Sequence, residues 1–228
     1  MTLRHVLFVL LLAPLGAAAQ APGETLFNLV TLRADAMREV ANDQLSAALA
    51  AEAEGTDTAQ LADEVNRAMQ KALAAAKAYR SVNVRSGTYQ TFPVYDKGRI
   101  ARWRVRQELR LQSTDIPAAT ELIGRLQAGL VVNGMSLSVS PEARRQTENA
   151  LLAEAIAAFE ERARVVRDAM KAKDYRVRNL DFSGAGATPP PVHLLARQAS
   201  VAATRSQPAV EPGTTPILIT VSGTIQLQ

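Results

Sequence analysis

The sequence lacks cysteine and has little histidine, and both shortages restrict its chemistry. None of the 228 residues is cysteine, so the chain can form no disulfide and cannot carry a lipid on an acylated cysteine. Two histidines are present, His5 near the start and His193 in a proline-rich stretch. A zinc site is therefore nearly excluded, because zinc sites are built mainly from cysteine and histidine. His193 is also a poor candidate for a catalytic base, since a proline-rich segment would not hold it against a nucleophile.

The motifs of common enzymes are missing as well. The sequence contains no Gly-rich phosphate-binding loop, no dinucleotide fingerprint and no Asp-rich calcium loop. Two acidic pairs, Glu52 with Glu54 and Glu160 with Glu161, could in principle serve a glycoside hydrolase. The first pair lies in an alanine run without aromatic residues for stacking on sugars, and the second lies on the solvent side of a predicted helix. We therefore expect a protein that is not an enzyme and needs no metal or cofactor.

The charge is too evenly balanced to indicate a nucleic-acid partner. The chain has 26 basic and 22 acidic side chains, with a formal net charge of +4. Proteins that bind nucleic acid through a strong overall field carry a much larger basic excess. We therefore expect no nucleic-acid partner.

One stretch, at the N-terminus, has the pattern of an export signal. A basic start is followed by an apolar run over residues 6–15 and by small residues at 16–19, the order typical of a secretory signal peptide. The run is interrupted by Pro14 and is half of the roughly twenty residues that a membrane span needs, so an uncleaved anchor is the less favoured alternative. We expect cleavage after Ala19, removal of residues 1–19, and a periplasmic or secreted protein without an integral membrane segment.

Hydrophobic periodicity predicts alternating strands and helices over the remaining chain. Asp57 followed by Gln60 resembles a capping box, and Ser140 followed by Pro141 is a typical helix start. Strands are predicted near 24–40, 43–54, 80–95, 99–112, 135–139, 175–183 and 216–228, and helices at 58–78, 115–129 and 140–170. The segment 43–54 is interpreted as the antiparallel partner of 24–40, although its alanines could equally begin a helix.

These elements predict an α+β fold. In it, an antiparallel sheet carries two longer helices and one short helix packed on one face. Residues 20–184 would form the domain, and a loop rich in proline, alanine and serine over 185–215 would lead to a C-terminal strand at 216–228 that returns to the sheet.

Several short motifs resemble those of the SIMPL-domain family of secreted and periplasmic proteins. They are Asn42-Asp43-Gln44, Pro93-Val94-Tyr95, the run from Asn133 to Pro141, and Val221-Ser222-Gly223. The likeness extends over nearly all of residues 24–228. It implies an envelope location, a link to envelope antigens and to oxidative stress defence, and formation of multimers. It implies no set of catalytic residues.

The most unusual local feature is an arginine-rich strand within 99–112. Period-two alternation sends Trp103, Val105 and Leu109 to one face and the arginines to the other. We call Arg102, Arg104, Arg106 and Arg110 the arginine stripe. Four guanidinium groups at this spacing repel one another unless acids, an anionic ligand or solvent neutralise them. The stripe is therefore either an anion-binding or subunit-contact surface, or a solvated face paired with acids on neighbouring strands.

Two main functional hypotheses follow. The first is a non-enzymatic accessory protein of the cell envelope that forms a homo-oligomer and supports stress tolerance. The second is a binding module for an anionic envelope component, such as a phosphorylated lipid head group or glycan, through the arginine stripe. A hydrolase that uses carboxylates is a third and weaker alternative.

Overall fold

The structure is a computed structural model that describes residues 27–184 and 212–228. The predicted signal peptide, His193 and most of the predicted proline-rich loop lie outside the described residues. Within the described ranges the elements follow in the order β1 (Leu29–Ala41), β2 (Gln44–Gly55), α1 (Thr58–Ala76), β3 (Asn83–Asp96), β4 (Arg99–Ser113), α2 (Ile116–Leu126), β5 (Val131–Ser138), α3 (Pro141–Ala169), β6 (Tyr175–Gly184) and β7 (Thr214–Leu227). The α+β class predicted from the sequence is confirmed.

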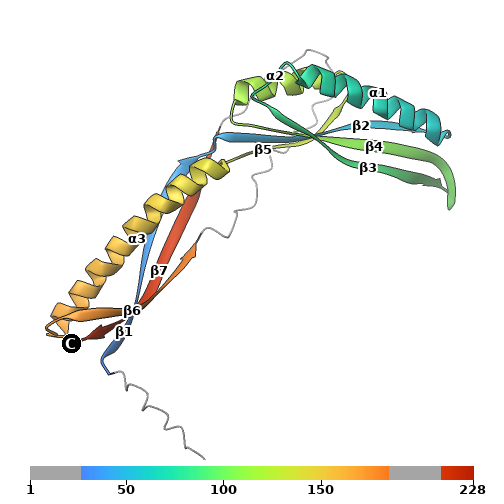
Figure 1. Cartoon of the computed structure of the whole chain (residues 1–228). Helices are drawn as coiled ribbons and strands as arrows, with labels where there is room; N and C mark the ends of the chain where they lie inside the picture. Colours follow the sequence, from blue (N-terminus) through green and yellow to red (C-terminus); the bar gives the residue numbers. More distant parts are fainter. Residues whose placement is uncertain (1–26, 185–211) are drawn as a thin grey trace, which may run out of the picture.

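The strands form two antiparallel sheets, each covered by its own helices, and not the single sheet with all helices on one face that the sequence predicts. One sheet has the order β3-β4-β2-β5 and the other has the order β1-β7-β6. Figure 1 shows α1 and α2 over the first sheet and α3 along the second, with the two layered bodies meeting end to end at an angle. We call them the four-stranded unit and the three-stranded unit.

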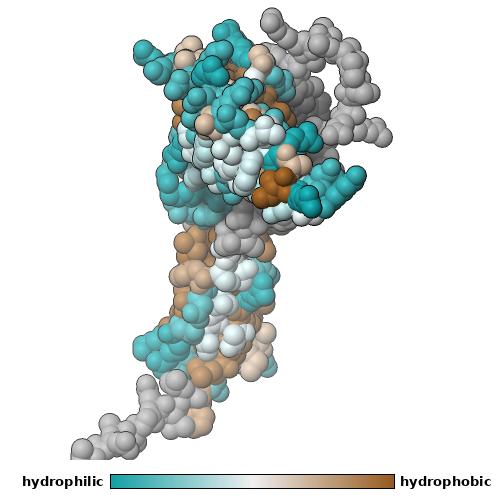
Figure 2. Space-filling model, turned by 90° about the vertical axis from the view of Figure 1, so that its right-hand side faces the viewer, coloured by the Kyte–Doolittle hydropathy of each residue, from teal (hydrophilic) through white to brown (hydrophobic). Residues whose placement is uncertain are grey.

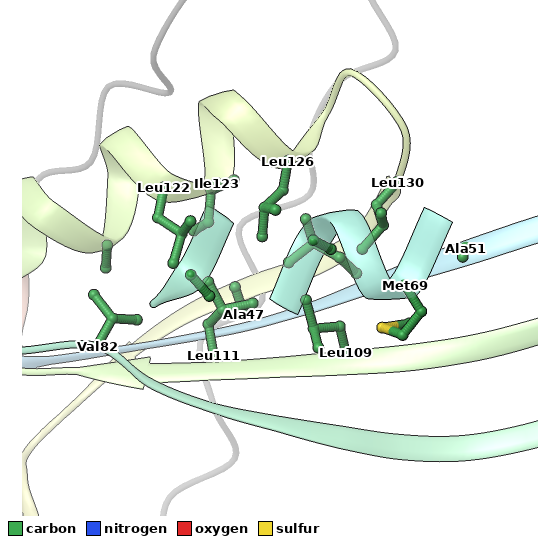
Figure 3. Close-up of a cluster of buried hydrophobic side chains, with 14 of the residues drawn as sticks. Ala47, Ala51, Met69, Val82, Leu109, Leu111, Leu122, Ile123, Leu126 and Leu130 are labelled. Carbon is green, nitrogen blue, oxygen red and sulfur yellow. The ribbon is translucent and has the colours of Figure 1, made fainter. Parts of the chain in front are cut away.

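The four-stranded unit is held together by apolar side chains between its sheet and the helices α1 and α2. Asp57 caps the N-terminus of α1, because its Oδ1 accepts hydrogen bonds from the backbone N–H groups of Ala59 and Gln60 at 2.9 and 3.2 Å. The core that the helices cover includes Leu45, Leu49, Val65, Met69, Leu109, Leu111, Leu122 and Ile123. Figure 3 shows the leucines of α2 directed toward Leu109 and Leu111 of β4. Helix α2 thus packs on the same face of the sheet as α1.

The three-stranded unit has a separate core between its sheet and α3. Ser140 caps α3, because its Oγ accepts from the N–H of Ala143 at 3.2 Å, and Pro141 occupies the first turn. The helix buries Leu151, Ala155, Phe159 and Ala163 against Ala34, Ile217, Val221 and Ile225 of the sheet. Periodicity in the sequence predicts that one stripe of this helix is buried, formed by Leu152, Ile156, Phe159, Ala163, Val166 and Met170. Phe159 and Ala163 are buried as predicted, Leu152, Ile156 and Val166 are half-buried, and Met170 is exposed.

The central strand of this sheet is β7, which contains a glycine in tight surroundings. A Cβ atom at Gly223 would collide with the carbonyl oxygen of Asn179 and would lie 2.9 Å from Leu180 Cδ2 and 3.2 Å from Phe159 Cζ. Strand β6 has a bulge beside this glycine, a shift of register between Val177 and Asn179. Gly223 therefore lets β6 and α3 approach β7 closely.

The two units meet where Asn42 and Asp43 join β1 to β2. Asn42 is buried, its N–H donates to the carbonyl oxygen of Gly213 at 2.9 Å, and its side chain accepts from the Thr215 hydroxyl at 2.7 Å. The Asp43 carboxylate accepts from the N–H and the hydroxyl of Ser140 at 2.5 and 2.7 Å. Both side chains bind residues far away in sequence, so this short connection fixes the start of α3 and the start of β7.

The predicted pairing of segments 24–40 and 43–54 with each other is wrong. Strand β1 pairs with β7, from Leu29 opposite Gln226 to Ala41 opposite Thr214, whereas β2 lies between β4 and β5. The chain continues from β1 into β2 with a bend at the junction, and it does not turn back to form a hairpin (Figure 1). Asn42 and Asp43 would have to form the turn of such a hairpin. Their polar groups instead form hydrogen bonds with Gly213 and Ser140, which are distant in sequence. The C-terminal strand does return to a sheet, as predicted, and occupies its centre.

Among the described residues, no helix combines the length and the apolar character that crossing a membrane requires.

Candidate functional site

The arginine stripe lies on the face of the four-stranded sheet opposite α1 and α2. Val105, Leu109 and Leu111 of β4 are buried beneath the helices, and Trp103 packs partly against the same core. The stripe residues alternate with them, so their side chains are on the other face, as predicted. This second face has no helix over it within the described parts of the chain (Figure 1).

The outer half of the stripe is neutralised by two glutamates of β2. Glu54 pairs in register with Arg104, and its carboxylate lies 2.8 Å from Arg104 Nη2 and 3.2 Å from Arg102 Nε. Glu52 lies 3.1 Å from Arg104 Nε. The hydrogen bond from Arg104 and the nearby charge of Arg102 lower the pKa of the Glu54 carboxyl group. Arg102 and Arg104 thus have acids on the neighbouring strand. For these two residues, the stripe is a solvated face paired with acids.

The inner half of the stripe is less well matched. Arg106 lies opposite Glu52 on β2 and Gln90 on β3, but no ion pair of Arg106 occurs within the described ranges. Arg110 lies opposite Ala48 on β2, and its acidic partner is Glu108 of its own strand, at 3.1 Å. Among the described residues, Arg106 is therefore the member of the stripe without an acid at ion-pair distance, whereas Arg110 is paired within its own strand.

A second arginine joins Arg110 from the edge strand β3. Arg85 lies directly opposite Arg110 in the register of β3 and β4, and its contact with Asn83 is a single side-chain hydrogen bond of 3.4 Å. Like charges directly opposite each other on neighbouring strands repel, so an acid or an anionic ligand would stabilise this pair. Arg85 could not be assigned to this site from the sequence, because it lies outside the arginine-rich strand and only the register of β3 and β4 brings it to Arg110.

The two arginines line a shallow groove of about 580 Å³. The rest of its lining is formed by Asn83, Ser86, Gly87, Thr88, Leu111 and Gln112. Glu108 packs beside the groove, where it leaves no room for a side chain at Gly87, since a Cβ there would lie 2.9 Å from its carboxylate oxygen. Guanidinium groups bind carboxylate and phosphate oxygens in a bidentate manner, so the groove is suited to a small oxyanion.

Exposed hydrophobic side chains form a second candidate surface. Most of them lie on strands at the edges of the two sheets, namely Leu29 and Met37 on β1, Tyr89, Phe92 and Tyr95 on β3, Val131 on β5, and Val177 and Phe182 on β6. The β3–β4 hairpin extends past the end of β2, whose last residue Gly55 lies opposite Trp103, and it carries exposed Tyr95 and Ile100. Figure 2 looks onto this end of the molecule and shows hydrophobic colour directly beside hydrophilic side chains.

The acidic pairs considered for a hydrolase are engaged in ion pairs. Glu52 and Glu54 bind the stripe, while Glu160 and Glu161 lie on the exposed side of α3, 3.6 and 2.6 Å from the guanidinium group of Arg164. Across residues 27–184 and 212–228, no three acidic or histidine side chains lie close enough together to hold a metal ion.

Comparison with known proteins identifies the family. No curated protein matches the chain. Among solved structures, a de novo designed protein, Foldit4, aligns with 15% sequence identity over 42% of this chain and 98% of its own length, at a TM-score of 0.27. The sequence profile of the SIMPL family, described as a protein of unknown function (DUF541), matches residues 30–225. The match covers most of the chain, and the resemblance seen in the sequence is thereby confirmed: the chain belongs to the SIMPL family.

Proposed function

We propose that the protein is a non-enzymatic accessory protein of the cell envelope that associates with copies of itself through its sheet edges. The observation that carries this proposal is the concentration of exposed hydrophobic side chains on edge strands. An exposed edge presents unpaired backbone N–H and C=O groups, and soluble proteins usually protect it with charges or proline. Here Tyr95 on β3 and Phe182 on β6 are 63% and 55% exposed. A role in stress tolerance is part of the proposal and rests on the family resemblance.

The test of self-association is the mass of the protein without residues 1–19, measured by size exclusion with light scattering over a range of concentrations. We expect a multiple of the monomer mass. Phe182→Lys and Tyr95→Lys each place a charge on an edge strand, and at least one should reduce the mass to that of the monomer. Val165→Lys is the matched control, because Val165 is 59% exposed but lies on α3 away from any strand edge. A monomer at every concentration, or an equal effect of the control, would contradict assembly through edges.

The test of the cellular role is separate. Cells that lack the protein should lose survival in peroxide, and the wild-type gene should restore it. If assembly is required, the variant that dissociates should fail to restore survival while the Val165→Lys control succeeds. Equal survival with and without the gene would remove stress tolerance from the proposal.

A second candidate function is binding of an anionic envelope component at the inner end of the stripe. The observation that favours it is the juxtaposition of Arg85 and Arg110 in a polar groove. We expect retention on phosphatidylglycerol vesicles that falls steeply with salt, because exposed charge pairs are screened by ions. Arg85→Gln with Arg110→Gln should abolish retention. Arg102→Gln with Arg104→Gln removes the same charge from the half of the stripe that Glu52 and Glu54 neutralise, so it should reduce retention much less.

Equal effects of the two double variants would indicate attraction by the whole charged face rather than by the groove. No retention by the wild-type protein on these vesicles would leave the arginine stripe as a solvated face paired with its glutamates.

A further inference from the structure

A groove of about 750 Å³ lies on the helical side of the four-stranded unit, between α1 and the segment that follows α2. It is separate from the arginine stripe, which occupies the opposite face of the sheet. The groove exists because α1 presents alanines where it faces the end of α2. Ala68, Ala72 and Ala75 are spaced by four and three residues, which places them on one side of the helix. Larger side chains at these positions would fill the space.

The floor of the groove is apolar and firmly packed. It is formed by Ala72 of α1, Leu126 of α2 and Leu130 of the following segment, all of which are buried. Figure 3 shows Leu126 and Leu130 directed toward the core of the unit from α2 and from the loop beyond it. A floor of this kind favours an alkyl or ring portion of a ligand, because burying apolar surface is favourable in proportion to its area.

The rim of the groove is basic. Arg67 and Lys71 of α1 and Arg125 of α2 line it, and Glu64 is the acidic side chain among the lining residues. Arg125 is held in place by an ion pair with Glu121 at 2.8 Å and by the ring of Tyr79, whose centre is 5.5 Å from its guanidinium carbon. Arg67 Nε donates a hydrogen bond to the carbonyl oxygen of Asp63 at 3.2 Å. Neither Arg67 nor Lys71 forms an ion pair within the part of the chain that the structure describes. Their charges are therefore available to an anion.

We propose that this groove binds a single-chain anionic amphiphile with a carboxylate head group. The volume is in the range of small-molecule sites, about 300–1,000 Å³, and such sites combine an apolar lining with a few convergent polar groups. The head group lies between Lys71 and Arg67, where charge-assisted hydrogen bonds hold it, and the alkyl chain lies along the alanines over Leu126 and Leu130. The proposal does not rest on self-association or on the arginine stripe.

The first experiment separates the two recognition elements with three probes. Decanoate, used below its micelle-forming concentration, carries both the charge and the chain. Acetate carries the charge without the long chain, and decyl maltoside carries an alkyl chain one carbon longer without a charge. Isothermal titration with the protein lacking residues 1–19 should show saturable one-to-one binding of decanoate, and at least tenfold weaker binding of the other two. Equal binding of acetate or of decyl maltoside, or no binding of decanoate, would overturn the proposal.

The second experiment tests whether decanoate binds in this groove. It compares variants of the lining that should weaken decanoate binding with one that should tighten it. Lys71→Gln should weaken decanoate binding by about tenfold, which corresponds to the loss of one charge-assisted hydrogen bond. Glu64→Gln removes the acid of the lining and should tighten binding. Lys173→Gln is the matched control, since it removes one exposed lysine charge in the turn before β6, within the three-stranded unit, and should leave binding unchanged.

The third variant tests the chain portion of the site. Ala75→Leu places a larger side chain over the floor, where Ala75 is half-buried and leucine is well tolerated in a helix, and it should abolish decanoate binding. Ala68→Leu serves the same purpose if the first variant proves unstable, and the helical circular-dichroism signal and melting temperature report the fold of both. Decanoate binding that is unaltered in folded Ala75→Leu and in Lys71→Gln would locate the ligand elsewhere and overturn the proposal.

Discussion

The replacement of Gly223 by alanine tests the packing of the three-stranded unit. Gly223 lies at the centre of β7, between the bulge of β6 and the ring of Phe159 on α3. The added methyl group would overlap the carbonyl oxygen of Asn179, a backbone atom that can move only if the β6 strand moves. On the helix side, Phe159 Cζ would lie 3.2 Å from the new Cβ atom. A shift of the methyl group in that direction would therefore displace α3.

The expected cost follows from the number of neighbours that must shift. Adding a methyl group to a tightly packed interior typically costs about 1–3 kcal/mol, and a backbone collision places Gly223→Ala at the upper end, about 2–3 kcal/mol. For a protein of this size, each kcal/mol lowers the melting temperature by about 2–4 °C, so we expect a decrease of about 5–10 °C.

The matched control is the same substitution at Gly124 in α2. A Cβ at Gly124 would meet no heavy atom within 4 Å, and alanine favours a helix over glycine by about 0.5–1 kcal/mol. Gly124→Ala should therefore raise the melting temperature by about 1–4 °C. Circular-dichroism melting of the two variants beside the wild type measures both effects. A Gly223→Ala variant as stable as the wild type would show that β6 and α3 do not approach β7 as described.

Four other outcomes are expected. The protein purified from the envelope should begin at Gln20 by N-terminal sequencing, and recovery of an intact N-terminus from membranes would refute cleavage. Truncation after Thr215 should unfold the three-stranded unit, because β7 is its central strand, and an unchanged melting curve would contradict this placement. Asp43→Ala should cost about 1–3 kcal/mol of stability, since the Ser140 N–H and hydroxyl lose their acceptor; equal stability in urea would argue against this link. The pKa of Glu54 is lowered in the folded state, so its ion pair stabilises the fold at pH values above the ordinary glutamate pKa. This stabilisation is lost as the pH falls through the lowered pKa, and Glu54→Gln should remove this contribution to the loss of stability in acid.

Features set by neighbouring residues could be predicted from the sequence. The caps at Asp57 and Ser140 involve backbone groups two or three residues away, so the starts of α1 and α3 were predicted within a residue. The alternation along β4 depends only on the geometry of one strand, and it correctly separated Val105 and Leu109 from the arginines. The family was also recognisable, because its motifs are contiguous.

Features that depend on strand register could not be predicted in this way. The pairing of Glu54 with Arg104 and the approach of Arg85 to Arg110 join residues on different strands, and a shift of one residue would have sent these side chains to the other face. The pairing of β1 with β7 was missed because adjacent segments usually form hairpins, whereas Asn42 and Asp43 bind Gly213 and Ser140 instead. The groove between α1 and α2 arises from the tertiary placement of the alanines and left no local signal.

The absence of a hairpin between β1 and β2 also bears on the order in which the protein folds. The four-stranded unit is one continuous segment, from Gln44 to Ser138, and its sheet needs no strand from outside that range. Strand β1 can pair only after β7 has been made. Thr31 and Thr224, which face each other in the β1–β7 pair, are 193 residues apart. Contacts between such distant segments form late, because closing a long loop costs entropy before pairing compensates for it. During synthesis, the first strand of the three-stranded unit thus remains without its partner until β7 has been made, and over that interval it is most open to pairing with another chain.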